Sequence, residues 1–152
     1  MADIVLDTNM FRLLVEEGYV RGVVELCDHI YVAACAMREA KSKLHHLINL
    51  IDHHLRLLNE HGKWHVVGQV DTRPFRQAWE TVMRRFKGDP CDRQIVELAL
   101  HRHFRGGQDT MLVSEDYHIR RLAGLMERYG ITTLGYDEEL DRVSRGKKER
   151  AS

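Results

Sequence analysis

The chain has 152 residues, of which 43% are apolar, and its 23 Lys and Arg residues balance its 23 Asp and Glu residues. This length and composition fit one domain with a single hydrophobic core. The sequence holds no run of about 18 apolar residues, and Asp3 lies where a signal peptide would carry basic residues, so we expect a cytoplasmic protein with no membrane span. The neutral net charge neither supports nor excludes a nucleic acid partner.

Five short apolar runs alternate with segments of helical periodicity. This alternation predicts an α/β fold with a parallel central sheet of four to five strands flanked by helices. The runs cover residues 4–6, 30–34, 65–67, 111–113 and 131–134.

The helical segments are bounded by capping residues and glycines. We expect a first helix from the Asp7 region to Gly18, the longest helix from about Cys35 to Glu60, and two further helices, from Pro74 to Phe86 and from the Asp89 region to Gly106. The domain is predicted to span residues 1–143. Residues 144–152 form a basic tail with no apolar face, which we expect to be disordered.

The cysteines and histidines are poorly spaced for metal binding. Cys27, Cys35 and Cys91 are odd in number and contain no Cys-x-x-Cys pair, which predicts buried thiols rather than a disulfide framework or a zinc site. Six of the ten histidines fall within residues 43–65, but their pairs lie about two helical turns, or roughly 11–13 Å, apart. We expect these histidines to lie on helix faces.

Acidic residues recur where the predicted strands end. Asp7 follows the run 4–6, and Asp116 follows the run 111–113. Ligands of open α/β sheets bind outside the carboxyl ends of the strands, so both positions suit chemistry, although Asp7 taken alone is equally good as a helix cap. Glu39 and Asp92 each lie early in a predicted helix and can face the same pocket.

Four carboxylates in one pocket repel one another, and a divalent cation removes that repulsion. Mg²⁺ and Mn²⁺ prefer hard oxygen ligands, and one ion or a pair can serve in phosphodiester hydrolysis. The acidic positions therefore suggest a metal-dependent nuclease.

The acids, taken in order, resemble the PIN-domain ribonucleases. The likeness rests on "IVLDTN", a Glu about thirty residues later, the "D-x-x-I-x-x-x-A" pattern and "LVSED". It implies a Rossmann-like PIN fold and a Mg²⁺- or Mn²⁺-dependent endoribonuclease. It also implies an acidic quartet that binds the metal and carries out catalysis, formed by Asp7, Glu39, Asp92 and Asp116. Asn9 and Ser114 would be the polar residues that hold the metal site or its water.

The same resemblance implies partners. Single-domain members are often homodimers, and many are VapC-type toxins paired with a small antitoxin. Basic side chains near the predicted cleft are candidate RNA contacts or, equally, solvated helix faces. These are Arg84, Arg85, Lys87, Arg120 and Arg121.

Two other functions compete with the nuclease. A haloacid-dehalogenase-like phosphatase also places an Asp after its first strand, but it needs a second Asp two residues later, where this chain has Asn9. A PIN-like module that only binds RNA or a protein would tolerate loss of an acid, and none of the four is lost.

Overall fold

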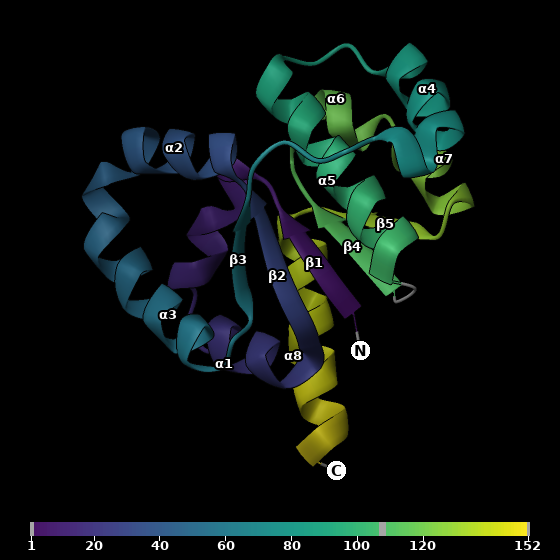
Figure 1. The fold of residues 1–152 in the computed structure, drawn as a ribbon. Helices are drawn as coiled ribbons and strands as arrows, with labels where there is room; N and C mark the ends of the chain where they lie inside the picture. The colour runs from purple at the N-terminus through teal and green to yellow at the C-terminus, as the bar shows by residue number, and fades with distance from the viewer. Residues whose placement is uncertain (1, 107–108, 152) are drawn as a thin grey trace.

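The computed structural model describes residues 2–106 and 109–151. Its centre is a five-stranded sheet in which every paired strand is parallel, with the order β3-β2-β1-β4-β5 (Figure 1). The strands are β1 (Ala2–Leu6), β2 (Cys27–Ala33), β3 (Trp64–Val67), β4 (Asp109–Val113) and β5 (Ile131–Leu134). All five predicted strands are confirmed, and so is the Rossmann-like α/β class.

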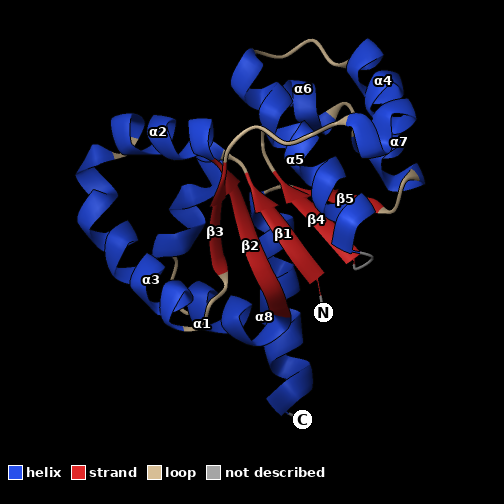
Figure 2. Ribbon diagram, in the orientation of Figure 1, coloured by secondary structure: helices blue, strands red, loops and turns tan. Residues whose placement is uncertain are grey.

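Helices cover both faces of the sheet (Figure 2). Helix α5 packs on one face against β1, β2 and β4, while α1 and α8 pack together behind the sheet. The helical segments are η1 (Thr8–Val15), α1 (Tyr19–Leu26), α2 (Ala34–Lys43), η2 (His45–Leu47), α3 (Ile48–Glu60), η3 (Arg73–Phe75), α4 (Arg76–Arg85), α5 (Pro90–Gly106), α6 (Tyr117–Arg120), α7 (Ala123–Arg128) and α8 (Tyr136–Ala151). Within the described ranges, none of these helices is long and apolar enough to cross a membrane.

The central strand is buried on both sides, which explains its unbroken apolar sequence. Ile4, Val5 and Leu6 are almost fully buried. β1 pairs with β2 on one side and with β4 on the other, so the end of the strand at Leu6 lies beside Val113. The residues that follow β1 and β4 therefore emerge next to each other.

The long helix predicted from about Cys35 to Glu60 is wrong as a single element. The chain leaves the helix at Leu44, passes through the short turn η2 and starts again at Ile48. The break lets α2 pack on both η1 and α5, while α3 packs on η1 and α1. The apolar spacing continues across the break, which is why the sequence pattern does not show it.

The two ends of the chain also differ from the prediction. The first helical segment is a 3-10 helix that ends at Val15, followed by Gly18 with a positive φ of 77° and then by α1. At the other end, α8 continues to Ala151, through the segment expected to be disordered. This helix lies against α1, where a Cβ on Gly22 would meet the Val143 side chain.

Cys35 and Cys91 form a disulfide, with their Cα atoms 5.8 Å apart. The prediction of buried thiols is wrong for these two residues. They are 56 positions apart in the sequence, but α2 and α5 contact each other and bring them together.

Candidate active site

The strand order reverses between β1 and β4. From β1 the chain moves outward to β2 and β3, crosses back through α5, and then builds β4 and β5 on the other side. A doubly wound sheet has its ligand crevice at this reversal, outside the carboxyl ends of the strands. In Figure 1 this edge of the sheet is uppermost, with α2 and α5 beginning beside it.

Asp7 is the first residue after β1 and is only 2% exposed. One carboxylate oxygen accepts a hydrogen bond from the Thr8 N–H at 2.6 Å, and the other accepts one from the Ser114 hydroxyl at 2.5 Å. Burial raises the pKa of Asp7; the two hydrogen bonds oppose this, and the negative charges of Asp116 and Glu39 add to it. The same carboxylate caps η1, so capping and site chemistry coincide.

Ser114 connects Asp7 to Asp116. Its hydroxyl donates to Asp7 and accepts from the Asp116 N–H at 3.0 Å, and its side chain is fully buried. Asp116 in turn caps α6, where it accepts from the N–H groups of His118 and Ile119 at 2.9 and 3.1 Å. The structure thus places two of the predicted acids side by side, with the predicted supporting serine between them.

Glu39 reaches the same group through Thr8. The Thr8 hydroxyl donates to Glu39 Oε2 at 3.3 Å, while its backbone N–H binds Asp7. Lys43, one turn further along α2, lies 3.8 Å from the same oxygen but is largely exposed, so it neutralises Glu39 only weakly. Thr8 is a functional candidate that the sequence analysis missed, because its neighbour Asn9 was chosen instead.

Asp92 lies in the first turn of α5 and completes the acidic quartet of Asp7, Glu39, Asp92 and Asp116. Burial raises its pKa to about 7, and the negative charges of Asp116, Asp7, Asp89 and Glu39 all add to the shift. Its own N–H donates to the Asp89 carboxylate at 2.8 Å. Asp92 therefore lies within electrostatic reach of the other three acids but is joined to them by charge rather than by hydrogen bonds.

The donor chemistry of the quartet suits a divalent cation. Four carboxyl groups supply hard oxygens, and their mutual repulsion is what a cation would relieve. In the described part of the chain, however, no three His, Cys, Asp or Glu side chains lie in position to coordinate one ion. The carboxylates are close enough to influence each other's ionisation but not gathered around a single point.

The other predicted site residues lie in different surroundings. Asn9 is exposed in the first turn of η1. Arg84, Arg85 and Lys87 are exposed at the end of α4 and in the loop that leads to α5 and Asp92. These three basic side chains are therefore exposed on the segment that leads to Asp92.

Arg120 and Arg121 differ from each other. The Arg120 guanidinium donates to the Thr133 carbonyl at 3.2 Å and to Glu138 at 2.8 Å, which ties α6 to β5 and α8. Arg121 is exposed and lies 5.5 Å from the ring centre of Tyr117. Tyr117, the residue after Asp116, is 66% exposed and is a possible ligand contact that no pattern in the sequence indicated.

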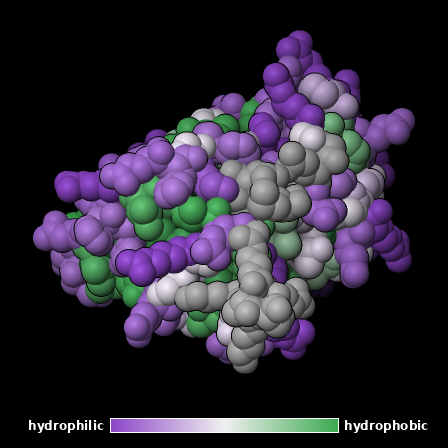
Figure 3. All heavy atoms as spheres, turned by 90° about the horizontal axis from the view of Figure 1, so that it is seen from below, coloured by the Kyte–Doolittle hydropathy of each residue, from purple (hydrophilic) through white to green (hydrophobic). Residues whose placement is uncertain are grey.

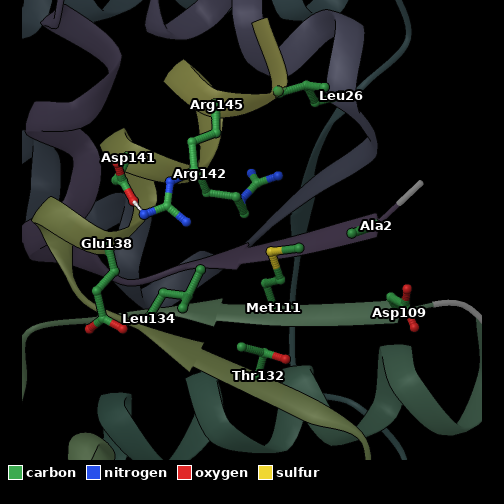
Figure 4. Close-up of a pocket in the computed structure, with 11 residues that line it drawn as sticks. Ala2, Leu26, Asp109, Met111, Thr132, Leu134, Glu138, Asp141, Arg142 and Arg145 are labelled. Carbon is green, nitrogen blue, oxygen red and sulfur yellow. Dashed lines mark ion pairs between the residues drawn. The ribbon is translucent and has the colours of Figure 1, made fainter. Parts of the chain in front are cut away.

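A pocket of about 610 Å³ lies away from the quartet, between α8 and the strands β1, β4 and β5 (Figure 4). Met111, Leu134 and Thr132 point into it from the strands, and an ion pair of 2.9 Å between Arg145 and Asp141 lies along α8. None of the four acids lines this pocket. The face seen from below, opposite the carboxyl ends of the strands, is mainly hydrophilic with apolar areas between the charged side chains (Figure 3).

No family model matches the sequence, and no curated protein is significantly similar to it. The fold and the position of the quartet therefore carry the functional argument.

Proposed function

We propose that the protein is a Mg²⁺- or Mn²⁺-dependent endoribonuclease of the PIN type. The observation that supports this most directly is the convergence of Asp7, Asp116 and Glu39, through Ser114 and Thr8, at the crevice between β1 and β4. The fourth acid, Asp92, adds its charge to the same place. A phosphatase of the haloacid-dehalogenase type is not favoured, because Asn9 is exposed and is not an acid.

Each residue has a role that its surroundings suit. Asp7 and Asp116 would hold the divalent ion, since both carboxylates are oriented by hydrogen bonds to their own backbone segments. The ion would supply positive charge to the scissile phosphodiester and activate a water as nucleophile. Asp92, whose pKa is raised in the metal-free protein by burial and by the neighbouring acids, is placed to accept a proton from that water, and Glu39 can orient it.

The surface around the quartet suits single-stranded RNA. Arg84, Arg85 and Lys87 can contact the phosphate backbone on the α5 side. On the α6 side, the exposed ring of Tyr117 offers a surface on which a base can stack, with Arg121 beside it. Arg120 is not included, because Thr133 and Glu138 already occupy its guanidinium.

The direct test is cleavage of single-stranded and structured RNAs by the purified protein, with Mn²⁺ or with a chelator. We expect Mn²⁺-dependent cleavage by the wild type and at least a hundredfold loss in Asp7→Asn, because the amide cannot supply the same charge. Asp52→Asn, at an exposed position of α3, is the matched control and should cleave normally. Equal cleavage by wild type and Asp7→Asn, or cleavage that survives the chelator, would contradict the proposal.

A homodimer, a small antitoxin and a cytoplasmic location belong to the same proposal through the resemblance to toxins of this family. Size-exclusion chromatography with light scattering tests the dimer. Copurification of a small protein from the native host tests the antitoxin. A monomer that brings no partner would leave a free-standing nuclease as the simpler assignment.

A further inference from the structure

The disulfide between Cys35 and Cys91 lies next to two members of the quartet. Cys35 and Glu39 are four residues apart on α2 and therefore share one face of that helix. Cys91 directly precedes Asp92 in the first turn of α5. The covalent bond thus joins the two helices at the positions that carry Glu39 and Asp92.

The rest of the quartet is held in a different way. The Asp7 carboxylate accepts hydrogen bonds from Thr8 and Ser114, and the Asp116 carboxylate accepts them from the N–H groups of His118 and Ile119. Glu39 has one long hydrogen bond from Thr8, at 3.3 Å, and Asp92 is linked to the other acids by charge alone. The disulfide is therefore the firmest link between the two loosely held acids.

Both redox states of the pair fit the fold. The Cα separation of 5.8 Å is within the usual range for a disulfide. When the pair is reduced, the Cys35 thiol has an acceptor close by, because its Sγ lies 3.7 Å from the Cys91 carbonyl oxygen. Cys91 is partly exposed, so a small reagent can reach it.

Reduction removes the only covalent link that the structure shows between α2 and α5. Asp92 is repelled by Asp116, Asp7 and Asp89 and, least of all, by Glu39, and the disulfide then no longer restrains it. Once Glu39 and Asp92 can move away, an ion bound by Asp7 and Asp116 would lose part of the negative charge that surrounds it. Its affinity should therefore fall when the disulfide opens.

We propose that Cys35 and Cys91 are a reversible redox site that controls metal binding by the acidic quartet. Oxidation by a low-molecular-weight disulfide, such as oxidised glutathione, converts the two thiols to a disulfide; the reagent takes up the two electrons and two protons and leaves as two thiols. The oxidised form is the one that binds metal tightly. This inference rests on the proposed function only in so far as the quartet is the metal site.

The test measures Mn²⁺ affinity by titration calorimetry for protein oxidised with glutathione disulfide and for protein reduced and then desalted without oxygen. Peptide mass mapping of the oxidised sample should show Cys35 joined to Cys91. We expect the oxidised form to bind Mn²⁺ at least tenfold more tightly than the reduced form. Cys91→Ser should bind like the reduced wild type after either treatment, whereas Cys27→Ser, which removes the third cysteine, should keep the full response.

The comparison of the two wild-type forms needs no variant, so a folding defect in Cys91→Ser does not block it. Equal Mn²⁺ affinity in the two forms, an unlinked pair in the peptide map, or a redox response that persists in Cys91→Ser would overturn the inference. RNA cleavage assayed on the same samples separates the two proposals. If the Mn²⁺ affinity depends on the redox state but no RNA is cleaved, the nuclease proposal alone is contradicted. If RNA is cleaved but the Mn²⁺ affinity does not change with the redox state, the redox proposal alone is contradicted. If neither form binds Mn²⁺, both proposals are contradicted.

Discussion

Asp7 shows how one residue can serve the fold and the site together. Its carboxylate caps η1 through Thr8 and also accepts from Ser114, although burial and nearby acids disfavour its charged form. The two hydrogen bonds are what keep a negative charge tolerable in a residue that is 2% exposed. The capping and catalytic interpretations of Asp7 are therefore compatible rather than alternatives.

Ser114→Ala should weaken both the fold and the proposed metal site. The substitution leaves a buried Asp7 oxygen and the Asp116 N–H without their shared partner, which costs about 1–3 kcal/mol of unfolding free energy. Urea denaturation measures this loss, with the exposed Ser144→Ala on α8 as the control. A Ser114→Ala protein as stable as the wild type would mean that the serine does not support Asp7.

The raised pKa of Asp92 predicts a pH dependence with a definite sign. Because its pKa in the fold, about 7, lies above the ordinary value of 3.8, the stability that Asp92 contributes to the metal-free protein is fully present at low pH and is lost as the pH rises through about 7. Bound Mn²⁺ favours the charged form. We therefore expect Mn²⁺ to raise the melting temperature more at pH 8 than at pH 6.

Thermal melts with and without Mn²⁺ across this pH range check the prediction. Asp92→Asn cannot ionise, so its Mn²⁺-dependent shift should be smaller and should vary less with pH. A stabilisation by Mn²⁺ that is the same at pH 6 and pH 8 in the wild type would contradict the role given to Asp92.

At the scale of elements, the packing of α1 against α8 depends on a small residue. Gly22 lies on α1 where a Cβ would meet the β-branched side chain of Val143. Gly146, one turn further along α8, approaches Leu26, and a Cβ there would come within 2.6 Å of that side chain. These close approaches show that α8 packs tightly on α1 as far as Gly146.

Gly22→Ala should therefore be destabilising although alanine favours helices. Overpacking costs about 1–3 kcal/mol, and alanine regains about 1 kcal/mol of helix propensity, so we expect a net loss of up to about 2 kcal/mol. Urea denaturation of the single variant and of Gly22→Ala with Val143→Ala provides the measurement. Val143→Ala makes room for the new methyl group, so it should lower the free energy of unfolding less in the Gly22→Ala protein than in the wild type. If the effects of the two substitutions on the free energy of unfolding are simply additive, the steric explanation is excluded.

At the scale of the whole molecule, exposed arginines lie on elements that lead to different ends of the sheet. Arg84 and Arg85 lie in the last turn of α4, from which the chain continues to the start of α5 and Asp92. Arg128 is also exposed, but it lies in the last turn of α7, which leads into the amino end of β5. The carboxyl and amino ends of the strands are thus distinct surfaces, and the proposed RNA path follows the first.

Replacing Arg84 and Arg85 with alanine should weaken binding of single-stranded RNA and reduce its salt dependence. Each lost phosphate contact lowers the slope of log affinity against log salt by about 0.7. Fluorescence anisotropy in chelator, which prevents metal-dependent cleavage, measures both quantities. Arg128→Ala is the control; an equal effect from this variant would indicate a non-specific attraction spread over the surface.

Much of the fold followed from local pattern. The five strands were predictable because each contains a short apolar run, although only β1, among the strands that the structure describes, is buried along its whole length. Asp7 and Asp116 were predictable because they follow two of those runs. The break at Leu44 was not, because the apolar spacing of α2 and α3 continues through it and only their different packing partners separate them.

Long-range pairings were beyond the sequence argument. The union of Cys35 with Cys91 depends on how α2 and α5 meet, which no spacing along the chain reveals. The same applies to Arg120, whose partners lie on β5 and at the start of α8. Thr8 was overlooked because its hydroxyl acts on Glu39, 31 residues away, rather than on its own helix.

The hydrogen bond between Ser114 and Asp7 joins residues 107 positions apart, and this separation has a consequence for synthesis of the protein. A chain emerging from the ribosome carries β1, β2 and β3 long before β4, so the inner edge of β1 stays unpaired until most of the polypeptide has been made. Only after β4 has been made can Asp7 accept its second hydrogen bond, from Ser114, and lie beside Asp116. A nascent chain that ends before residue 116 is therefore unable to assemble the quartet, and any activity that depends on the quartet begins only after translation has passed that residue.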